Sequence, residues 1–234
     1  MSREGRCGWT GTVRLRDGEQ LSQRMVEFDP GKCEFVIAKG TLKSPPPTPT
    51  RSESEPLSAA GVAPRATILK TPNVRQYFGD SGCSESGAAC DSAIVYDVGV
   101  GLSYSYQATK SHDPIHARVV AGYLGMEAQI SGSCVTAGRA AWEHYWLAVT
   151  GWHRDYAQSF VTEWLSCNGF GAATYGVYTN NAFCQEFTWL GDYATVEFYN
   201  HMTVRPVYTD FEYNIWFDGN CTQLLHADID NYRV

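Results

Sequence analysis

Apolar and polar residues alternate with a two-residue period along much of the chain. In YATVEFY, residues 193–199, Ala194, Val196 and Phe198 point one way, and tyrosine, threonine and glutamate side chains point the other. This period is typical of an antiparallel strand with one buried and one exposed face. Such strands are expected at 9–16, 24–29, 33–42, 94–108, 115–125, 126–135, 142–156, 170–180 and 192–219.

Turn signals separate many of these runs, among them Pro30-Gly31, Asp113-Pro114, Asn180-Asn181 and Asp218-Gly219. Residues 136–149 contain good helix formers, but their tryptophan, tyrosine and valine content favours a strand. Many strands at short spacing predict an all-β fold. We expect an antiparallel β-sandwich or barrel, jelly-roll-like or lipocalin-like, that is reinforced by disulfides.

The chain divides by composition into three parts. Proline, serine and threonine dominate residues 44–66, which form a linker or a long loop. Residues 1–43 hold three strands, too few to be stable alone, so we expect them to dock on the main body. Residues 67–234 are expected to form the main antiparallel β domain.

Eight cysteines in a chain of this kind predict disulfides and an oxidising compartment. Of the 105 possible sets of four pairs, we expect one in which a short Gly/Ser loop favours the pair at 83 and 90, segment neighbourhood favours two pairs, and the pair at 134 and 167 is the one that remains. The four pairs are Cys7–Cys33, Cys83–Cys90, Cys134–Cys167 and Cys184–Cys221. The start, MSREGRCGWT, lacks the apolar segment of a signal peptide. We therefore expect a secreted or extracellular protein whose leader is not present in this sequence.

Charge is unevenly distributed, and it narrows the set of partners. Residues 1–75 have a net charge of +4, whereas residues 76–234 have a net charge of −11. An acidic body repels phosphate backbones, so nucleic acid is not an expected partner. No run of about 18 apolar residues occurs, so no membrane span is expected.

The stretch WEHYWLAVTGWHRDY, residues 142–156, carries the densest aromatic pattern. Its even positions place a histidine among tryptophan and tyrosine side chains. The residues are Trp142, His144, Trp146, Trp152 and Tyr156. Flat aromatic rings bind the C–H faces of sugars, and polar side-chain groups bind the sugar hydroxyls. We expect an aromatic-lined cleft for a carbohydrate or another ring-bearing small molecule. The alternative is that these aromatics fill the core of a structural surface protein.

Two enzymatic alternatives use the same scaffold. A glycoside hydrolase needs two carboxylates about 5–10 Å apart. The candidate catalytic residues are Glu143, Glu163, Glu197, Glu212 and His144. A β-barrel cyclase would fold a small hydrophobic substrate within aromatic walls while a histidine or glutamate moves protons.

Other chemistry has weak support in the sequence. His112 and His116 have zinc-like spacing, but Asp113-Pro114 lies between them and disfavours a helix. There is no H-E-x-x-H motif, no G-x-S-x-G elbow and no phosphate-binding glycine loop. No metal and no cofactor are expected.

Overall fold

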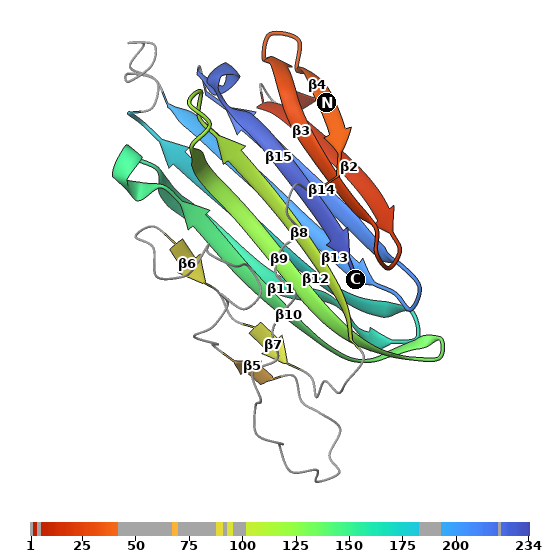
Figure 1. Cartoon of the computed structure of the whole chain (residues 1–234). Helices are drawn as coiled ribbons and strands as arrows, with labels where there is room; N and C mark the ends of the chain where they lie inside the picture. Colours follow the sequence, from red (N-terminus) through yellow and green to blue (C-terminus); the bar gives the residue numbers. More distant parts are fainter. Residues whose placement is uncertain are drawn as a thin grey trace.

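The computed structural model describes residues 2–3, 6–41, 67–69, 88–90, 93–95, 102–182, 193–219 and 221–234. Within these residues the chain forms two antiparallel β-sheets packed face to face (Figure 1). The expected all-β architecture is confirmed, and the structure is a sandwich rather than a barrel. In the described segments no helix is long and apolar enough to cross a membrane.

Among the described residues, one sheet has six strands and the other has nine. The six-stranded sheet has the order β1 (Ser2–Arg3), β2 (Arg6–Leu15), β14 (Thr209–Asp218), β13 (Ala194–Val204), β12 (Gly169–Asn180), β11 (His153–Ser166). The nine-stranded sheet has the order β4 (Glu34–Gly40), β3 (Gln20–Asp29), β15 (His226–Arg233), β8 (Leu102–His112), β9 (Arg118–Ser131), β10 (Cys134–Trp146), β7 (Ala93–Val95), β5 (Thr67–Leu69). The short strand β6 (Ala88–Cys90) also pairs with β10.

The chain crosses between the sheets several times. Strands β8, β9 and β10 form a meander, and the 3-10 turn Ala148–Thr150 leads into the six-stranded sheet. There β11 to β14 form a second meander, and the turn Thr222–Leu224 leads back to β15 beside β8. Strand β2 pairs with β14, and β3 pairs with β15. The N-terminal strands therefore extend both sheets. The predicted linker, 44–66, lies outside the described residues.

Apolar side chains from both sheets fill the space between them. One buried cluster gathers around Trp9, Phe198 and Ile215, and a second gathers around Leu124 and Phe211. Burying such side chains supplies most of the stability of a sandwich. Of residues 136–149, for which a strand was expected over a helix, 136–146 belong to strand β10, whose aromatic content favours extended backbone, and the end of the stretch enters the 3-10 turn Ala148–Thr150.

Strand β8 places polar residues inside this apolar core. Its inward side chains are Ser103, Ser105, Gln107, Thr109 and Ser111. Buried polar groups are tolerated when they find hydrogen-bond partners. The Ser105 hydroxyl lies 2.7 Å from that of Thr209 on β14, and Gln107 Nε2 donates to the backbone oxygen of Glu212 at 3.1 Å. These contacts link the two sheets directly.

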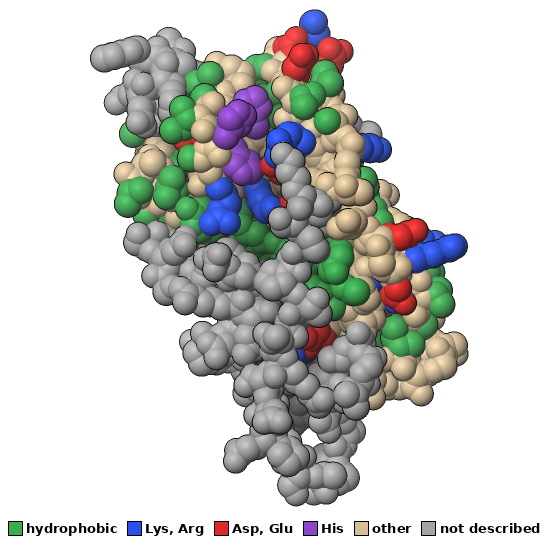
Figure 2. Space-filling model, in the orientation of Figure 1, with side chains coloured by type: hydrophobic (Ala, Val, Ile, Leu, Met, Phe, Trp, Pro, Cys, Tyr) green, Lys and Arg blue, Asp and Glu red, His purple; other side chains and the backbone are tan. Residues whose placement is uncertain are grey.

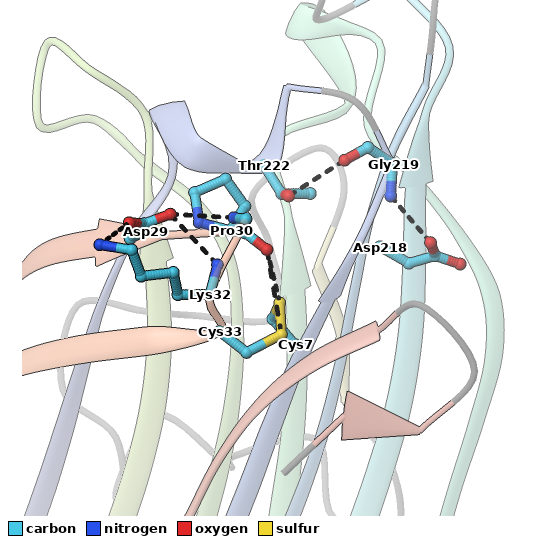
Figure 3. Close-up of a disulfide and its surroundings, with 9 residues drawn as sticks. Cys7, Asp29, Pro30, Lys32, Cys33, Asp218, Gly219 and Thr222 are labelled. Carbon is cyan, nitrogen blue, oxygen red and sulfur yellow. Dashed lines mark hydrogen bonds and ion pairs between the residues drawn. A yellow bond between two sulfur atoms is a disulfide. The ribbon is translucent and has the colours of Figure 1, made fainter.

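Two disulfides between described residues join the sheets covalently. Cys7 on β2 is bonded to Cys33 in the turn between β3 and β4 (Figure 3). In that turn Asp29 Oδ1 accepts backbone hydrogen bonds from Gly31 at 3.0 Å and Lys32 at 3.2 Å. Figure 3 shows the turn lying against the start of β2. The expected Pro-Gly turn and its disulfide are confirmed.

The expected Cys134–Cys167 bond is also formed, and it links β10 to the turn between β11 and β12. Cys221 is disulfide-bonded as well. The expected pairs Cys83–Cys90 and Cys184–Cys221 include Cys83 and Cys184, which lie outside the described residues.

The two described bonds lie at opposite ends of the sandwich. Cys7 pairs in register with Phe217 near the end of β14. Cys167 lies just before Phe170, which pairs with Val204 at the end of β13. Because β13 and β14 are antiparallel, these positions mark the two ends of the six-stranded sheet. The sheets are therefore tied together at both ends.

Gly122 allows the sheets to approach closely at the middle of β9. A Cβ atom added to Gly122 would lie 1.8 Å from Cε2 of Phe198. We expect Gly122→Ala to lower the free energy of unfolding by about 1–3 kcal/mol, because the Phe198 ring must move. Urea denaturation measures this change.

Gly40→Ala is the matched control, since nothing lies within 4 Å of a Cβ added at the end of β4. It is expected to change the unfolding free energy by less than about 1 kcal/mol. Equal losses in the two variants would contradict the close approach at Gly122.

Candidate functional site

Most of the predicted aromatic site lies inside the sandwich. Trp142 and Trp152 are each 1% exposed, and they belong to different core clusters. His144 is fully buried, and Trp146 is partly buried against the core. Tyr156 alone of the five is well exposed, at 49%. The predicted residues therefore do not form a surface platform.

The local chain path explains this arrangement. Residues 142–146 belong to β10 in the nine-stranded sheet, whereas Tyr156 belongs to β11 in the six-stranded sheet. Between them the chain makes a 3-10 turn that ends at Gly151, whose φ is +87°. The two-residue period does not continue through a turn, so the even positions point to different places.

His144 belongs to a buried polar network. Its Nδ1 lies 2.7 Å from the Tyr178 hydroxyl, and its Nε2 lies 2.9 Å from the Thr174 hydroxyl. Its ring stacks on Phe198 with centroids 5.9 Å apart. Burial, and secondarily the charge of Arg154, lowers the pKa of His144 to about 3. The imidazole is therefore neutral at physiological pH, and it is sealed from a substrate in solution.

The candidate glutamates lie on opposite outer faces. Glu143 is buried on the outer face of the nine-stranded sheet, where it pairs in register with Tyr123. Glu197 and Glu212 lie on the outer face of the six-stranded sheet. Glu163 contacts Arg205 at 3.9 Å near one end of that sheet. No two of these carboxylates face each other in the strand register.

An aromatic band crosses the outer face of the six-stranded sheet. We define it as Tyr156, Tyr175, Tyr199 and Trp216, one residue from each of β11, β12, β13 and β14. Tyr156 and Tyr175 have ring centroids 5.7 Å apart, and Tyr175 lies directly opposite Tyr199. Apart from Tyr156, which is exposed, the members of the band are half-buried.

Trp216 completes the band by leaning over β2. A Cβ on Gly8, its partner in register, would lie 2.2 Å from Cδ1 of Trp216. The missing side chain at Gly8 therefore lets the indole lie flat across the neighbouring strand. At about 4.8 Å per strand, the band extends about 19 Å from β11 to β2.

Charged and polar groups accompany the band. Glu197 accepts a hydrogen bond from Arg6 at 2.8 Å, and Tyr175 is hydrogen-bonded to the same carboxylate. Burial first, and then Glu197, raises the pKa of Tyr175 to about 12, so its hydroxyl stays protonated. The Tyr156 hydroxyl donates to Gln158 at 2.6 Å. The band thus combines ring faces with fixed polar groups.

The outer face of the nine-stranded sheet has a different character. Tyr106, Tyr123 and Tyr145 are buried there, and burial raises the pKa of Tyr106 and Tyr123. Arg118 donates to the Tyr123 hydroxyl at 2.5 Å and lies 4.0 Å over the Tyr145 ring. The tyrosines of this face therefore already have partners within the protein, as Arg118 is for Tyr123 and Tyr145.

Histidines gather at one end of the same face, beside lysine and arginine side chains (Figure 2). His112 and His226 are partners in register, and the rings of His116 and His226 are 5.9 Å apart. Asp228 accepts from Arg24 at 3.0 Å and lies 3.9 Å from His112. Among the described residues no group of three or more histidine, cysteine or acidic side chains is arranged to hold a metal.

An open hollow of about 430 Å³ lies at the end of the sandwich near the Cys134–Cys167 bond. Arg205 and Tyr208 contribute to its lining. Arg205 is already paired with Asp210 at 3.3 Å and with the backbone oxygen of Asn168. The charge in this hollow is therefore compensated by the protein itself.

No family model, curated protein or solved structure matches this chain.

Sequence reasoning missed three members of the band, although a signal for them was present. The alternation at 193–199 already placed Tyr199 on the face opposite Val196 and Phe198. The same period in 170–180 places Tyr175 opposite the buried Thr174 and Tyr178. Aromatic residues at the outward positions of half-buried strands therefore indicate which rings lie on an outer face.

The low pKa of His144 makes stability depend on pH. The unfolded chain binds a proton at this residue below about pH 6.5, whereas the folded chain does so only near pH 3. Between these values the unfolded state holds more protons, so stability falls as pH is lowered. His144→Gln is expected to reduce this slope by up to about 1.4 kcal/mol per pH unit.

Urea unfolding between about pH 6.5 and pH 4 measures the slope. Thr136→Gln, at an exposed position on the same strand as His144, replaces no ionisable group and is the control that should leave the slope as in the parent. A parent-like slope in His144→Gln would show that this imidazole is not the group responsible.

Proposed function

We propose that the protein binds a carbohydrate chain across the aromatic band of the six-stranded sheet. The observation that carries this proposal is the row of Tyr156, Tyr175, Tyr199 and Trp216 across four adjacent strands on an outer face. An oligosaccharide is an extended ligand, and the band is an extended platform of about 19 Å.

The outer face of the six-stranded sheet is more aromatic than a solvated sheet face needs to be. The outer face of an antiparallel sheet ordinarily carries polar side chains. Tyrosine and tryptophan offer flat apolar surfaces to sugar C–H groups at small entropic cost, because their side chains have few rotatable bonds. Contiguous apolar surface rimmed by polar groups marks interaction sites.

Hydrogen-bonding groups beside the rings would fix the orientation of the sugar. Glu197 is held by Arg6, and Gln158 is held by Tyr156, so both are preorganised acceptors. Asn214 lies directly opposite Tyr199 in the register. Preformed polar groups reduce the ordering cost of binding and add selectivity for hydroxyl positions.

The disulfides favour an oxidising environment, and they support the further proposal that the protein acts outside the cell. Extracellular glycans are ligands of the right chemical class for such a location. The disulfides at both ends of the sandwich would hold the two sheets together outside the cell and so keep the aromatic band in place.

The two enzymatic alternatives have less geometric support. Glu197 faces Trp216 and Glu212 faces His201, four residues further along β13. These strand positions are about 13 Å apart, more than the 5–10 Å that a glycosidase pair needs. A β-barrel cyclase requires a closed barrel, whereas this chain forms two packed sheets.

Binding can be tested with β-1,4-linked hexasaccharides of glucose, xylose, mannose and N-acetylglucosamine. Because Trp216 belongs to the band, we expect its fluorescence to change on titration with at least one of them. Tyr175→Ala and Tyr199→Ala should each weaken that binding about tenfold, through loss of ring contact.

Tyr232→Ala is the control for loss of an aromatic side chain, because Tyr232 lies on the other sheet. It should leave the affinity unchanged. Absence of binding to all four sugars, or equal losses in all three variants, would contradict the proposal. The interpretation that would then remain is that the chain is a structural surface protein.

A further inference from the structure

A chain of hydrogen bonds on the same outer face joins a hydroxyl, an imidazole and a carboxylate. Thr162 Oγ1 lies 2.9 Å from His201 Nε2. His201 Nδ1 lies 3.2 Å from Glu212 Oε2. Each ring nitrogen thus has one partner, in the order used by enzymes that activate a hydroxyl nucleophile. The three residues come from β11, β13 and β14.

The strand between Thr162 and His201 leaves room for this contact. His201 lies opposite Ala173 on β12, and Glu163 lies opposite Gly171. A Cβ on Gly171 would lie only 2.6 Å from Thr162 Oγ1. Small residues on β12 therefore let the threonine side chain reach across that strand to the imidazole.

A bulge in β11 directs the threonine toward the imidazole. The register of β11 with β12 shifts between Val161 and Glu163, so Thr162 stands outside the regular pairing. Bulges bend a strand and re-aim a side chain, and they are frequent beside active sites. This irregularity lies at the residue that faces His201.

The group is both held in place and reachable. His201 and Glu212 are direct partners in register, and Gln107 holds the backbone oxygen of Glu212 at 3.1 Å from inside the core. Thr162 is exposed, while the side chains of His201 and Glu212 are 19% and 51% exposed. The aromatic band is next to it, with the ring of Tyr199 6.1 Å from that of His201.

We propose that Thr162, His201 and Glu212 form a hydrolytic triad that removes acyl groups esterified to sugar hydroxyls. The choice of substrate rests on the carbohydrate-binding function proposed above. A hydroxyl nucleophile with a histidine base attacks carbonyl carbon, and acyl esters are carbonyls that a glycan presents. The triad lacks the second carboxylate that glycosidic cleavage would require.

The acylation step takes one proton from the threonine. Thr162 Oγ1 attacks the ester carbonyl carbon while His201 Nε2 accepts the hydroxyl proton. The bond from that carbon to the sugar oxygen then breaks, and the sugar oxygen takes the proton back from Nε2. The acyl group is left as an ester on Thr162.

Water completes the cycle. A water molecule attacks the acyl-threonine carbonyl while His201 Nε2 accepts its proton. The bond to Oγ1 breaks, Oγ1 recovers the proton, and the acyl group leaves as a carboxylic acid. Glu212 accepts the Nδ1–H hydrogen bond throughout, which orients the ring and stabilises its charged form.

The test uses the full chain, 4-nitrophenyl acetate and a fluorophosphonate probe. We expect the parent to release 4-nitrophenol and to be labelled at Thr162, as located by mass spectrometry. Thr162→Ala should abolish labelling and reduce hydrolysis to the uncatalysed background. Thr162→Ser should retain both, since it keeps the hydroxyl. His201→Gln should slow hydrolysis by about 10²–10⁴-fold.

Thr10→Ala is the matched control, because Thr10 is an exposed threonine on β2 of the same sheet. It should keep the parental rate and labelling. An unlabelled parent, or an unchanged rate in a folded Thr162→Ala variant, would overturn the triad.

The outcome can be separated from that of sugar binding. Hexasaccharide binding, followed by tryptophan fluorescence, and hydrolysis of 4-nitrophenyl acetate are measured separately on the parent chain. Binding without hydrolysis would overturn the triad alone. Hydrolysis without binding of any hexasaccharide would overturn the carbohydrate proposal and leave an esterase for another class of ester.

Discussion

Hydrogen bonds between the sheets fix how one sheet lies on the other. Apolar contacts are non-directional, and they would allow the two sheets to pack in several offsets. Strand β8 instead presents buried polar side chains, of which Ser105, Gln107 and Thr109 meet partners on the opposite sheet at defined positions. Gln107 meets the backbone of Glu212, and Thr109 meets Asn200. Any other offset would break the bonds of Ser105, Gln107 and Thr109 to the opposite sheet.

This constraint reaches the outer surface through strand geometry. Successive residues of a strand point to opposite faces, so a core position determines the place of its neighbours. Asn200 is anchored to Thr109 and to the backbone of Gly122, which fixes the adjacent Tyr199 and His201. The interior of the sandwich therefore positions the aromatic band and the hydrogen-bonded residues Thr162, His201 and Glu212.

The sequence was sufficient for the fold and insufficient for the site. Alternation and turn residues are local signals, and they predicted strands such as β13 and the turn at Pro30-Gly31. The Cys7–Cys33 bond was expected because its two segments are neighbours along the chain, whereas Cys134–Cys167 was expected only as the pair that remained. The aromatic stretch at 142–156 was misleading, because alternation shows that two faces exist without showing which one is buried. The contacts of His201 required the register of β11, β12, β13 and β14, which no local pattern contains.

The irregular pairing of β11 has a consequence for solubility at high concentration. β11 is the last strand of its sheet among the described residues, and it carries exposed Tyr156, Phe160 and Trp164. A long, regular and apolar edge would be a template for pairing with a second molecule and for aggregation. The register of β11 breaks between Arg154 and Tyr156, at Thr162 and again before Ser166. These breaks, which include the bulge at Thr162, make β11 a poor template for strand pairing with a second molecule.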